Sequence, residues 1–88
     1  MNKYEVLLTS KAQKQLDKLS NNVAKPILKA IISLADDPRP LGFKKLKGRP
    51  AFRIRIQNYR VIYEIRDKVL LVEVIAVGHR KGSIPLSV

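Results

Sequence analysis

The stretch "FRIRIQNYRVIYEI", residues 52–65, indicates the architecture of the second half of the chain. In its first five residues arginine alternates with apolar side chains, which is the period-two pattern of a strand with one buried face. The polar pair at 57–58 predicts a turn, and the alternation that resumes over 59–66 predicts a second strand. The quoted stretch therefore places three arginines on the predicted hairpin: Arg53, Arg55 and Arg60.

Further strands are predicted on both sides of this hairpin. The apolar run "VLLVEVIAV" at 69–77 is rich in β-branched residues, and it predicts a central strand that is buried on both faces. Near the N-terminus, "YEVLL" at 4–8 predicts a short strand whose alternate apolar residues share one face.

Two amphipathic helices are predicted between the first strand and the hairpin. Ser10 followed by Gln13 matches a capping box at the start of the first helix, and Asn22 is the expected cap of the second. "DDPRP" at 36–40 ends the second helix, because the residue before a proline is pushed out of the α region. This order predicts an α+β fold in which an N-terminal strand, a helical hairpin and an antiparallel strand meander form one antiparallel sheet with two helices packed on one face.

Length and composition limit the classes of protein that the chain can represent. Its 88 residues predict a single domain, 1–88, without room for a second core. The absence of cysteine excludes disulfides, thiolate nucleophiles and cysteine-based metal sites. There is no signal-peptide pattern and no stretch of ~20 apolar residues, so we expect a cytoplasmic protein that has no membrane partner.

Charge is the strongest compositional signal. Eighteen lysines and arginines against seven acidic residues give a net charge of +11. Such an excess suits binding to phosphate backbones, although an acidic protein or a membrane surface is attracted by the same field. Strand arginines are also the ordinary solvated side of a half-buried sheet. Three of them on adjacent strands, with Arg80 after the last strand and few carboxylates nearby, favour a two-pronged grip on phosphates.

Several short motifs carry a resemblance to a known family. They are "LKG" before the hairpin, "RIR" and "NYRVIYEI" within it, and "VGHR" after the last strand, all within 46–82. In this order and spacing the chain resembles the RelE-like branch of the RelE/ParE superfamily of bacterial and archaeal toxins. The resemblance implies the toxin of a type II toxin–antitoxin system, with a microbial-ribonuclease-like sheet, that cuts messenger RNA in the ribosomal A site.

The family's chemistry, carried over to this chain, depends on charged side chains. In RelE-like enzymes the 2′-OH of the RNA attacks the adjacent phosphate, so the resemblance implies no protein nucleophile, no metal and no cofactor. Guanidiniums stabilise the negative charge that develops in the transition state. The implied catalytic arginines are Arg53, Arg55, Arg60 and Arg80. The implied partners are a cognate antitoxin, the ribosome with its messenger RNA, and operator DNA only through the antitoxin.

Other basic side chains near the motifs are additional candidates. His79 is the only histidine, and histidine is the residue type that exchanges protons near neutrality, so it is a candidate general acid or base. The alternative is a histidine that packs or hydrogen-bonds at a strand end. The candidate RNA contacts, which are otherwise a solvated surface, are Lys44, Lys45, Lys47 and Lys81.

Three functions remain open on the sequence. The first is the metal-independent endoribonuclease described above. The second is a ParE-like toxin that acts on DNA gyrase and is no nuclease. The third is a binding module that pairs with its antitoxin and co-represses an operon. The third stays open because the chain ends in "KGSIPLSV", without the tyrosine that RelE-like chains carry after the closing arginine.

Overall fold

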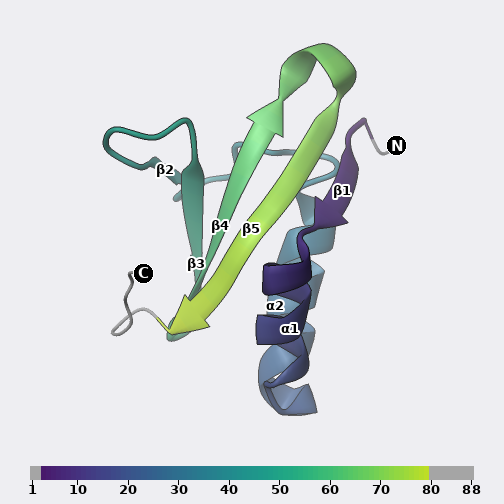
Figure 1. Ribbon diagram of the computed structural model, residues 1–88, viewed down its shortest axis with the longest axis vertical. Coiled ribbons are helices and arrows are strands. Elements are labelled where there is room, and N and C mark those ends of the chain that lie inside the picture. Colours follow the sequence, from purple (N-terminus) through teal and green to yellow (C-terminus); the bar gives the residue numbers. More distant parts are fainter. Residues whose placement is uncertain (1–2, 80–88) are drawn as a thin grey trace.

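The computed structural model of the protein describes residues 3–79 (Figure 1). Within these residues one strand precedes a pair of helices in the sequence and the other strands follow it, in an order close to the predicted one. The elements are β1 (Glu5–Leu8), α1 (Ser10–Asp17), α2 (Asn21–Ser33), β2 (Lys44–Lys45), β3 (Phe52–Ile56), β4 (Tyr59–Arg66), a 3₁₀ turn (Asp67–Val69) and β5 (Leu71–His79).

The strands form one five-stranded sheet in the order β1-β5-β4-β3-β2. β3, β4 and β5 pair antiparallel, as a meander should, and β2 adds a short edge strand. β1 instead runs parallel to β5, with Leu8 opposite Val74 (Figure 1). The predicted α+β class is confirmed, but the sheet is mixed and not purely antiparallel. The reason is that β1 and β5 are separated by most of the chain, so no tight turn dictates their relative direction.

Both helices begin before the predicted start. α1 begins at Ser10, and the hydroxyl of Thr9 caps it by accepting a hydrogen bond from the amide of Ala12 at 3.1 Å. The same hydroxyl donates to the carbonyl of Ile75 at 3.1 Å, so the start of α1 is tied to β5. α2 likewise begins directly after Ser20, and the two predicted caps are therefore already helical residues.

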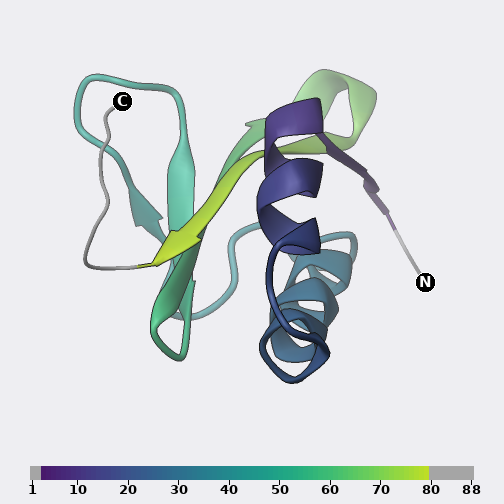
Figure 2. The ribbon, with the colours of Figure 1, turned by 60° about the horizontal axis from the view of Figure 1, so that its bottom comes forward.

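Both helices cover the same face of the sheet, which we call the helix face (Figure 2). The predicted apolar stripes of the helices pack there against inward side chains of β3, β4 and β5. The buried cluster consists of Ala12, Leu16, Ile27, Ile31, Leu34, Ile54, Val61, Tyr63, Val72, Val74 and Val77. Neither helix within residues 3–79 has the length and apolar content needed to cross a membrane.

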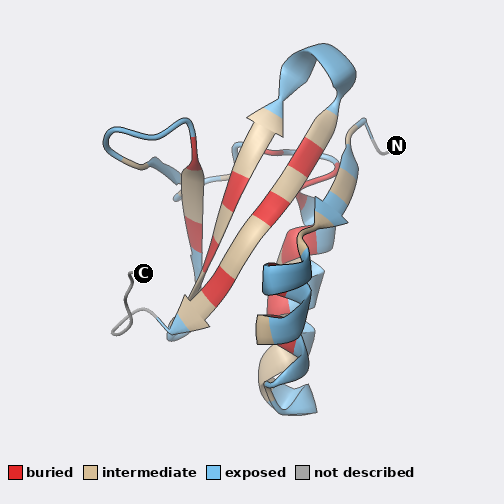
Figure 3. Cartoon of the chain, in the orientation of Figure 1, coloured by how far each residue is buried: buried red, intermediate tan, exposed pale blue. Residues whose placement is uncertain are grey.

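The opposite side of the sheet, which we call the open face, has no described helix over it. This arrangement overturns one prediction about β5. Val72, Val74 and Val77 are buried on the helix face, whereas the residues that alternate with them are only half-buried (Figure 3). β5 is central in the sheet but is not buried on both faces, because the two helices lie on one side.

Polar contacts hold the connection between α2 and β2 against the sheet. The buried Tyr63 hydroxyl donates to the carbonyl of Pro38 at 2.8 Å, and burial raises the pKa of Tyr63 to about 12. Arg39 makes a two-pronged ion pair with Asp67, whose carboxylate also accepts a hydrogen bond from the Tyr4 hydroxyl at 2.6 Å. The hydrogen bond from Arg39 has the larger effect and the one from Tyr4 the smaller, and both lower the pKa of the Asp67 carboxyl. This clamp joins the N-terminal segment, the connection and the 3₁₀ turn.

Candidate nucleic-acid interface

Basic side chains from three neighbouring strands meet at one end of the open face. The strand register places Arg55 directly opposite Arg60, and Lys44 directly opposite Arg53. Directly opposed residues share a face, and so do residues two apart along a strand. The residues that alternate with these arginines point to the helix face, where they pack in or against the core. We therefore define a basic cluster on the open face, which consists of Lys44, Arg53, Arg55 and Arg60.

The arginines of the basic cluster are not neutralised by carboxylates. Within residues 3–79, none of the three forms an ion pair. The pKa of Arg53 is lowered, first by its partial burial and then by the positive charges of Arg55 and Arg60. Arg53 stays charged at neutral pH because the usual pKa of arginine is above 12. A bound phosphate would relieve this mutual repulsion, and each guanidinium can donate to two of its oxygens.

At the other end of the open face, an arginine is paired with acidic residues. Glu64 and Glu73 lie directly opposite each other on β4 and β5. A terminal nitrogen of Arg66 lies 3.3 Å from Glu64 and 3.2 Å from Glu73, and it offsets the repulsion between the two carboxylates. The sequence did not indicate this trio, because it depends on the pairing of β4 with β5. Glu64 is therefore engaged away from the basic cluster.

His79 is not brought together with the basic cluster. It lies directly opposite Tyr59, and the two rings meet edge to face with their centroids 5.2 Å apart. Val77, two residues earlier on the strand, is buried on the helix face, so His79 projects toward that side of the sheet. Arg60 instead faces Gly78 on the open face. This placement favours packing over acid–base chemistry for His79.

The other candidate residues take separate positions. Lys45 lies opposite Phe52, which packs against the core, so Lys45 points away from the open face. Lys47 is exposed in the loop between β2 and β3. Arg80 and Lys81 lie outside the described residues.

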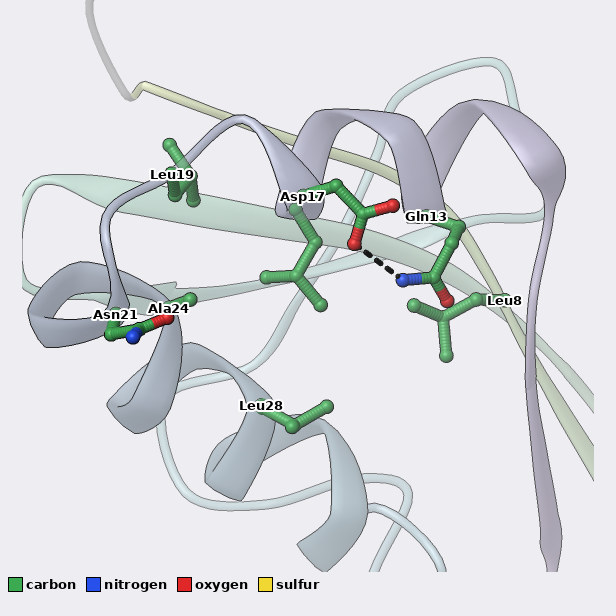
Figure 4. A pocket seen from close by; sticks show the side chains of 8 residues that line it. Leu8, Gln13, Asp17, Leu19, Asn21, Ala24 and Leu28 are labelled. Atoms are coloured by element: carbon green, nitrogen blue, oxygen red, sulfur yellow. Dashed lines mark hydrogen bonds between the residues drawn. The ribbon is translucent and has the colours of Figure 1, made fainter.

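A groove between α1 and α2 lies away from the basic cluster, on the helix side of the molecule (Figure 4). It is lined by leucines of β1 and both helices, with Gln13 and Asp17 at its polar end. Among residues 3–79, no three histidine, aspartate or glutamate side chains gather in a group that could hold a metal ion.

Known toxins are similar to this chain in sequence and in fold. The mRNA interferase toxin RelE of Escherichia coli is 32% identical over 76 residues, which cover 83% of this chain and 79% of that protein. A toxin–antitoxin complex from Mycobacterium tuberculosis contains a similar chain, with a TM-score of 0.79, 28% identity, and coverage of 88% of this chain and 98% of that chain. The isolated Escherichia coli RelE toxin gives a TM-score of 0.77 at 29% identity, covering 91% of this chain and 87% of that chain.

These matches confirm a RelE-like toxin of the RelE/ParE superfamily. The family model described as the ParE toxin of type II toxin–antitoxin systems matches residues 6–84, and the chain belongs to this family. The protein is therefore the toxin of a type II toxin–antitoxin system.

Proposed function

We propose that the protein is a ribosome-dependent mRNA endoribonuclease whose basic cluster stabilises the transition state of RNA cleavage. The observation that carries this proposal is the set of three arginines on neighbouring strands that have no carboxylate partner within residues 3–79. The name of the Escherichia coli relative, mRNA interferase, supports the same kind of activity at 32% identity.

In the proposed reaction, the RNA supplies its own nucleophile. The 2′-oxygen forms a bond to the adjacent phosphorus, the bond from phosphorus to the 5′-oxygen breaks, and a 2′,3′-cyclic phosphate results. One proton leaves the 2′-OH and one reaches the departing 5′-oxygen. Negative charge gathers on the non-bridging phosphate oxygens, and a well-placed donor to such oxygens is typically worth ~3 to 4 kcal/mol. We propose that guanidiniums supply this stabilisation without a metal ion.

The geometry suggests how the arginines divide the work. Arg60 is central, because it lies on β4 between Arg55 of β3 and Gly78 of β5. A phosphate above Arg60 is therefore within reach of neighbouring guanidiniums. On this geometry we assign Arg60 to the transition state, and Arg53 and Arg55 also to docking of the messenger. Arg80 lies outside the described residues, and we assign it to the transition state on the resemblance to RelE-like chains alone.

The remaining basic candidates that the structure describes divide according to their position, whereas Lys81 is assigned on the resemblance alone. Lys44 shares the open face with the arginines, and we assign it a contact with the RNA backbone. Lys47 and Lys81 are proposed as further contacts along the messenger. Lys45 and His79, which point to the other side of the sheet, are assigned no step.

The proposed partners follow from the family. We propose that a cognate antitoxin silences this toxin and that the complex meets operator DNA only through the antitoxin. The ribosome is the proposed platform that presents the messenger RNA. The similar chain from Mycobacterium tuberculosis was solved as a toxin–antitoxin complex, which supports the first of these partners.

A second candidate function is the ParE-like one, action on DNA gyrase without nuclease activity. The observation that favours it is the family model, which carries the ParE name and matches residues 6–84. Action on gyrase gives no role to the unpaired arginines of the basic cluster. For that reason we place this function second.

Primer extension on messenger RNA after induction of the toxin distinguishes the two functions. We expect discrete breaks within translated regions of the messenger and none in a matched message that lacks a start codon. Purified chain added to ribosomes programmed with the same messenger should reproduce the breaks. Growth arrest without breaks, together with inhibition of gyrase supercoiling in vitro, would overturn the nuclease proposal and establish the second function.

A further inference from the structure

A strand glycine lies beside the central arginine of the basic cluster. Gly78 is the cross-strand partner of Arg60, and Arg60 is in turn the partner of Arg55. The three residues form one row across β5, β4 and β3 on the open face. A glycine inside a strand weakens it, and such a glycine often marks a place where a ligand or another backbone approaches closely.

The described structure gives no internal reason for glycine at position 78. Gly42 and Gly48 have positive φ angles of 91° and 70°, which favour glycine, but Gly78 does not have a positive φ. A Cβ placed on Gly78 meets no heavy atom of residues 3–79 within 4 Å. Among the residues that the structure describes, none covers the surface of β5 beside Arg60, and a side chain at position 78 would occupy space next to the guanidinium.

The adjoining side of this opening is formed by α1. The helix runs beside the second half of β5, beyond the point where pairing with β1 has ended (Figure 1). The side-chain oxygen of Gln15 accepts a hydrogen bond from the amide of Val77 at 2.7 Å. This bond takes the place of a further strand partner, and it fixes the rotation of α1 against β5 one residue before Gly78.

The two flanks of α1 differ in charge. Gln13 donates to Asp17 at 2.9 Å, and both side chains line the groove toward α2 (Figure 4). At about 100° per residue, Lys11 and Lys18 fall on the opposite flank, next to Gln15. Because Gln13 and Asp17 face α2 on the helix side and Gln15 bonds to the edge of β5, this flank turns toward the side of the open face. The exposed side chains of this flank, which we call the lysine row, are Lys11, Lys14 and Lys18.

The lysine row has the same electrostatic character as the basic cluster. No ion pair among residues 3–79 includes any of its members. Two sets of uncompensated positive charge therefore border the opening at Gly78, one on the sheet and one on α1. Proteins that bind single-stranded nucleic acid track its backbone with such a positively charged groove.

We propose that a single RNA strand crosses the open face along the row Arg55, Arg60 and Gly78 and continues onto the lysine row. Gly78 is the gap that lets the backbone pass close to β5 while a phosphate is held by Arg60. This inference rests on the proposed function, because the strand is the messenger that the basic cluster cleaves. It assigns Gly78 and the lysine row to positioning of the RNA and to no chemical step.

A salt titration of RNA binding tests the lysine row. The probe is a short 2′-O-methyl RNA. The full chain can bind it but cannot cleave it, because the methylated 2′-oxygen cannot act as the nucleophile. The variant is Lys11→Gln with Lys18→Gln, and the matched control is Lys25→Gln with Lys29→Gln, which removes the same charge from the exposed side of α2. We expect the slope of log affinity against log salt to fall by about 1.4 in the first double variant, for two lost phosphate contacts, and to stay unchanged in the control. Equal slopes in the two double variants would overturn the proposed path.

Substitution of Gly78 tests the gap. Gly78→Gln adds bulk without charge, and Gly78→Ala adds only the Cβ that the structure can accept. We expect Gly78→Gln to weaken binding of the same probe about tenfold, because the phosphate loses a charged hydrogen bond, and Gly78→Ala to remain within about twofold. Thermal unfolding shows whether each variant is folded. A folded Gly78→Gln variant that binds like the wild type would overturn the role of Gly78.

Because the probe reports binding without chemistry, failure of the path and failure of the nuclease proposal are separable. If the wild type cuts ribosome-bound messenger while the two lysine double variants bind RNA alike, the path is wrong and the nuclease proposal stands. If the wild type never cuts messenger but the lysine and glycine variants behave as expected, the path stands and the nuclease proposal fails.

Discussion

The two ends of the open face present arginine in two electrostatic settings. At one end, Arg66 lies 3.3 Å from Glu64 and 3.2 Å from Glu73. At the other end, the arginines of the basic cluster have no carboxylate partner within residues 3–79, and the pKa of Arg53 is lowered by its burial and by repulsion from Arg55 and Arg60. Both groups alternate with inward-pointing residues on the same sheet. Pairing, and not strand position, therefore separates an arginine that supports the fold from one available to a ligand.

Arg39 follows the pattern of the paired end. It lies 2.8 Å from Asp67, and it also sits over the ring of Phe52 with its central carbon 5.9 Å from the ring centroid. Exposed ion pairs of this kind contribute little to stability, because solvent screens both charges. Removing a paired arginine should therefore lower the stability of the fold slightly and leave RNA cleavage unchanged. Removing an arginine of the basic cluster should instead lower RNA cleavage and leave the stability of the fold nearly unchanged.

The largest expected effect comes from the Arg60→Ala, Arg80→Ala double variant. Loss of both assigned transition-state donors should lower single-turnover cleavage by at least about two to three powers of ten. Growth arrest should disappear, while antitoxin binding remains. Lysine at the same positions should rescue only in part, because it keeps the charge but loses the planar two-pronged geometry. Growth arrest and cleavage at the wild-type level would remove the basis for the catalytic role.

A smaller effect is expected from neighbouring lysines on opposite sides of β2. Lys44→Ala should lower the salt slope of binding to uncleavable RNA by about 0.7, the value for one phosphate contact on a single strand. Lys45→Ala removes the same charge from the other side of the strand and should leave the slope unchanged. If both variants reduce the slope equally, the net charge of the protein, and not the open face, governs RNA binding.

The smallest effect is expected at the Arg39–Asp67 clamp, as a pH dependence of stability. The pKa of folded Asp67 is lowered, so its contribution is present above the unfolded value of about 3.9 and is lost as the pH falls through the folded value. The wild type should therefore melt above Asp67→Asn at neutral pH, and the gap should shrink below about pH 4. Thermal unfolding across this range measures it. A gap that stays constant into strong acid would show that Asp67 acts through something other than its charge.

The hairpin and its arginines could be predicted because the interactions are local. Alternation shows which residues share a face, and the two-residue turn at 57–58 brings Arg55 opposite Arg60. The features that escaped prediction depend on long-range pairing. The direction of β1 and the ion pairs of Arg66 both depend on how distant segments meet β5. A register shift between Ile62 and Tyr63 adds to this, because irregular pairing cannot be read from an apolar run.

The placement of His79 shows the same limit at the level of one residue. The run at 69–77 has no alternation of polar and apolar residues, so the sequence does not indicate which side of β5 His79 occupies. The lysine row, by contrast, follows from helical spacing alone. The sequence did not indicate the hydrogen bond between Gln15 and β5 that orients α1 against the sheet.

One matched comparison tests the central claim most directly: single-turnover cleavage of ribosome-bound messenger by Arg60→Ala and by Arg66→Ala. Both residues lie on β4, both point to the open face, and each substitution removes one positive charge. We predict that Arg60→Ala cleaves about 100- to 1,000-fold more slowly than the wild type. The cleavage rate of Arg66→Ala should stay within about twofold of the wild type, because Arg66 is already ion-paired with Glu64 and Glu73. Equal loss in both variants, or no loss in either, would contradict the claim that unpaired arginines carry the chemistry.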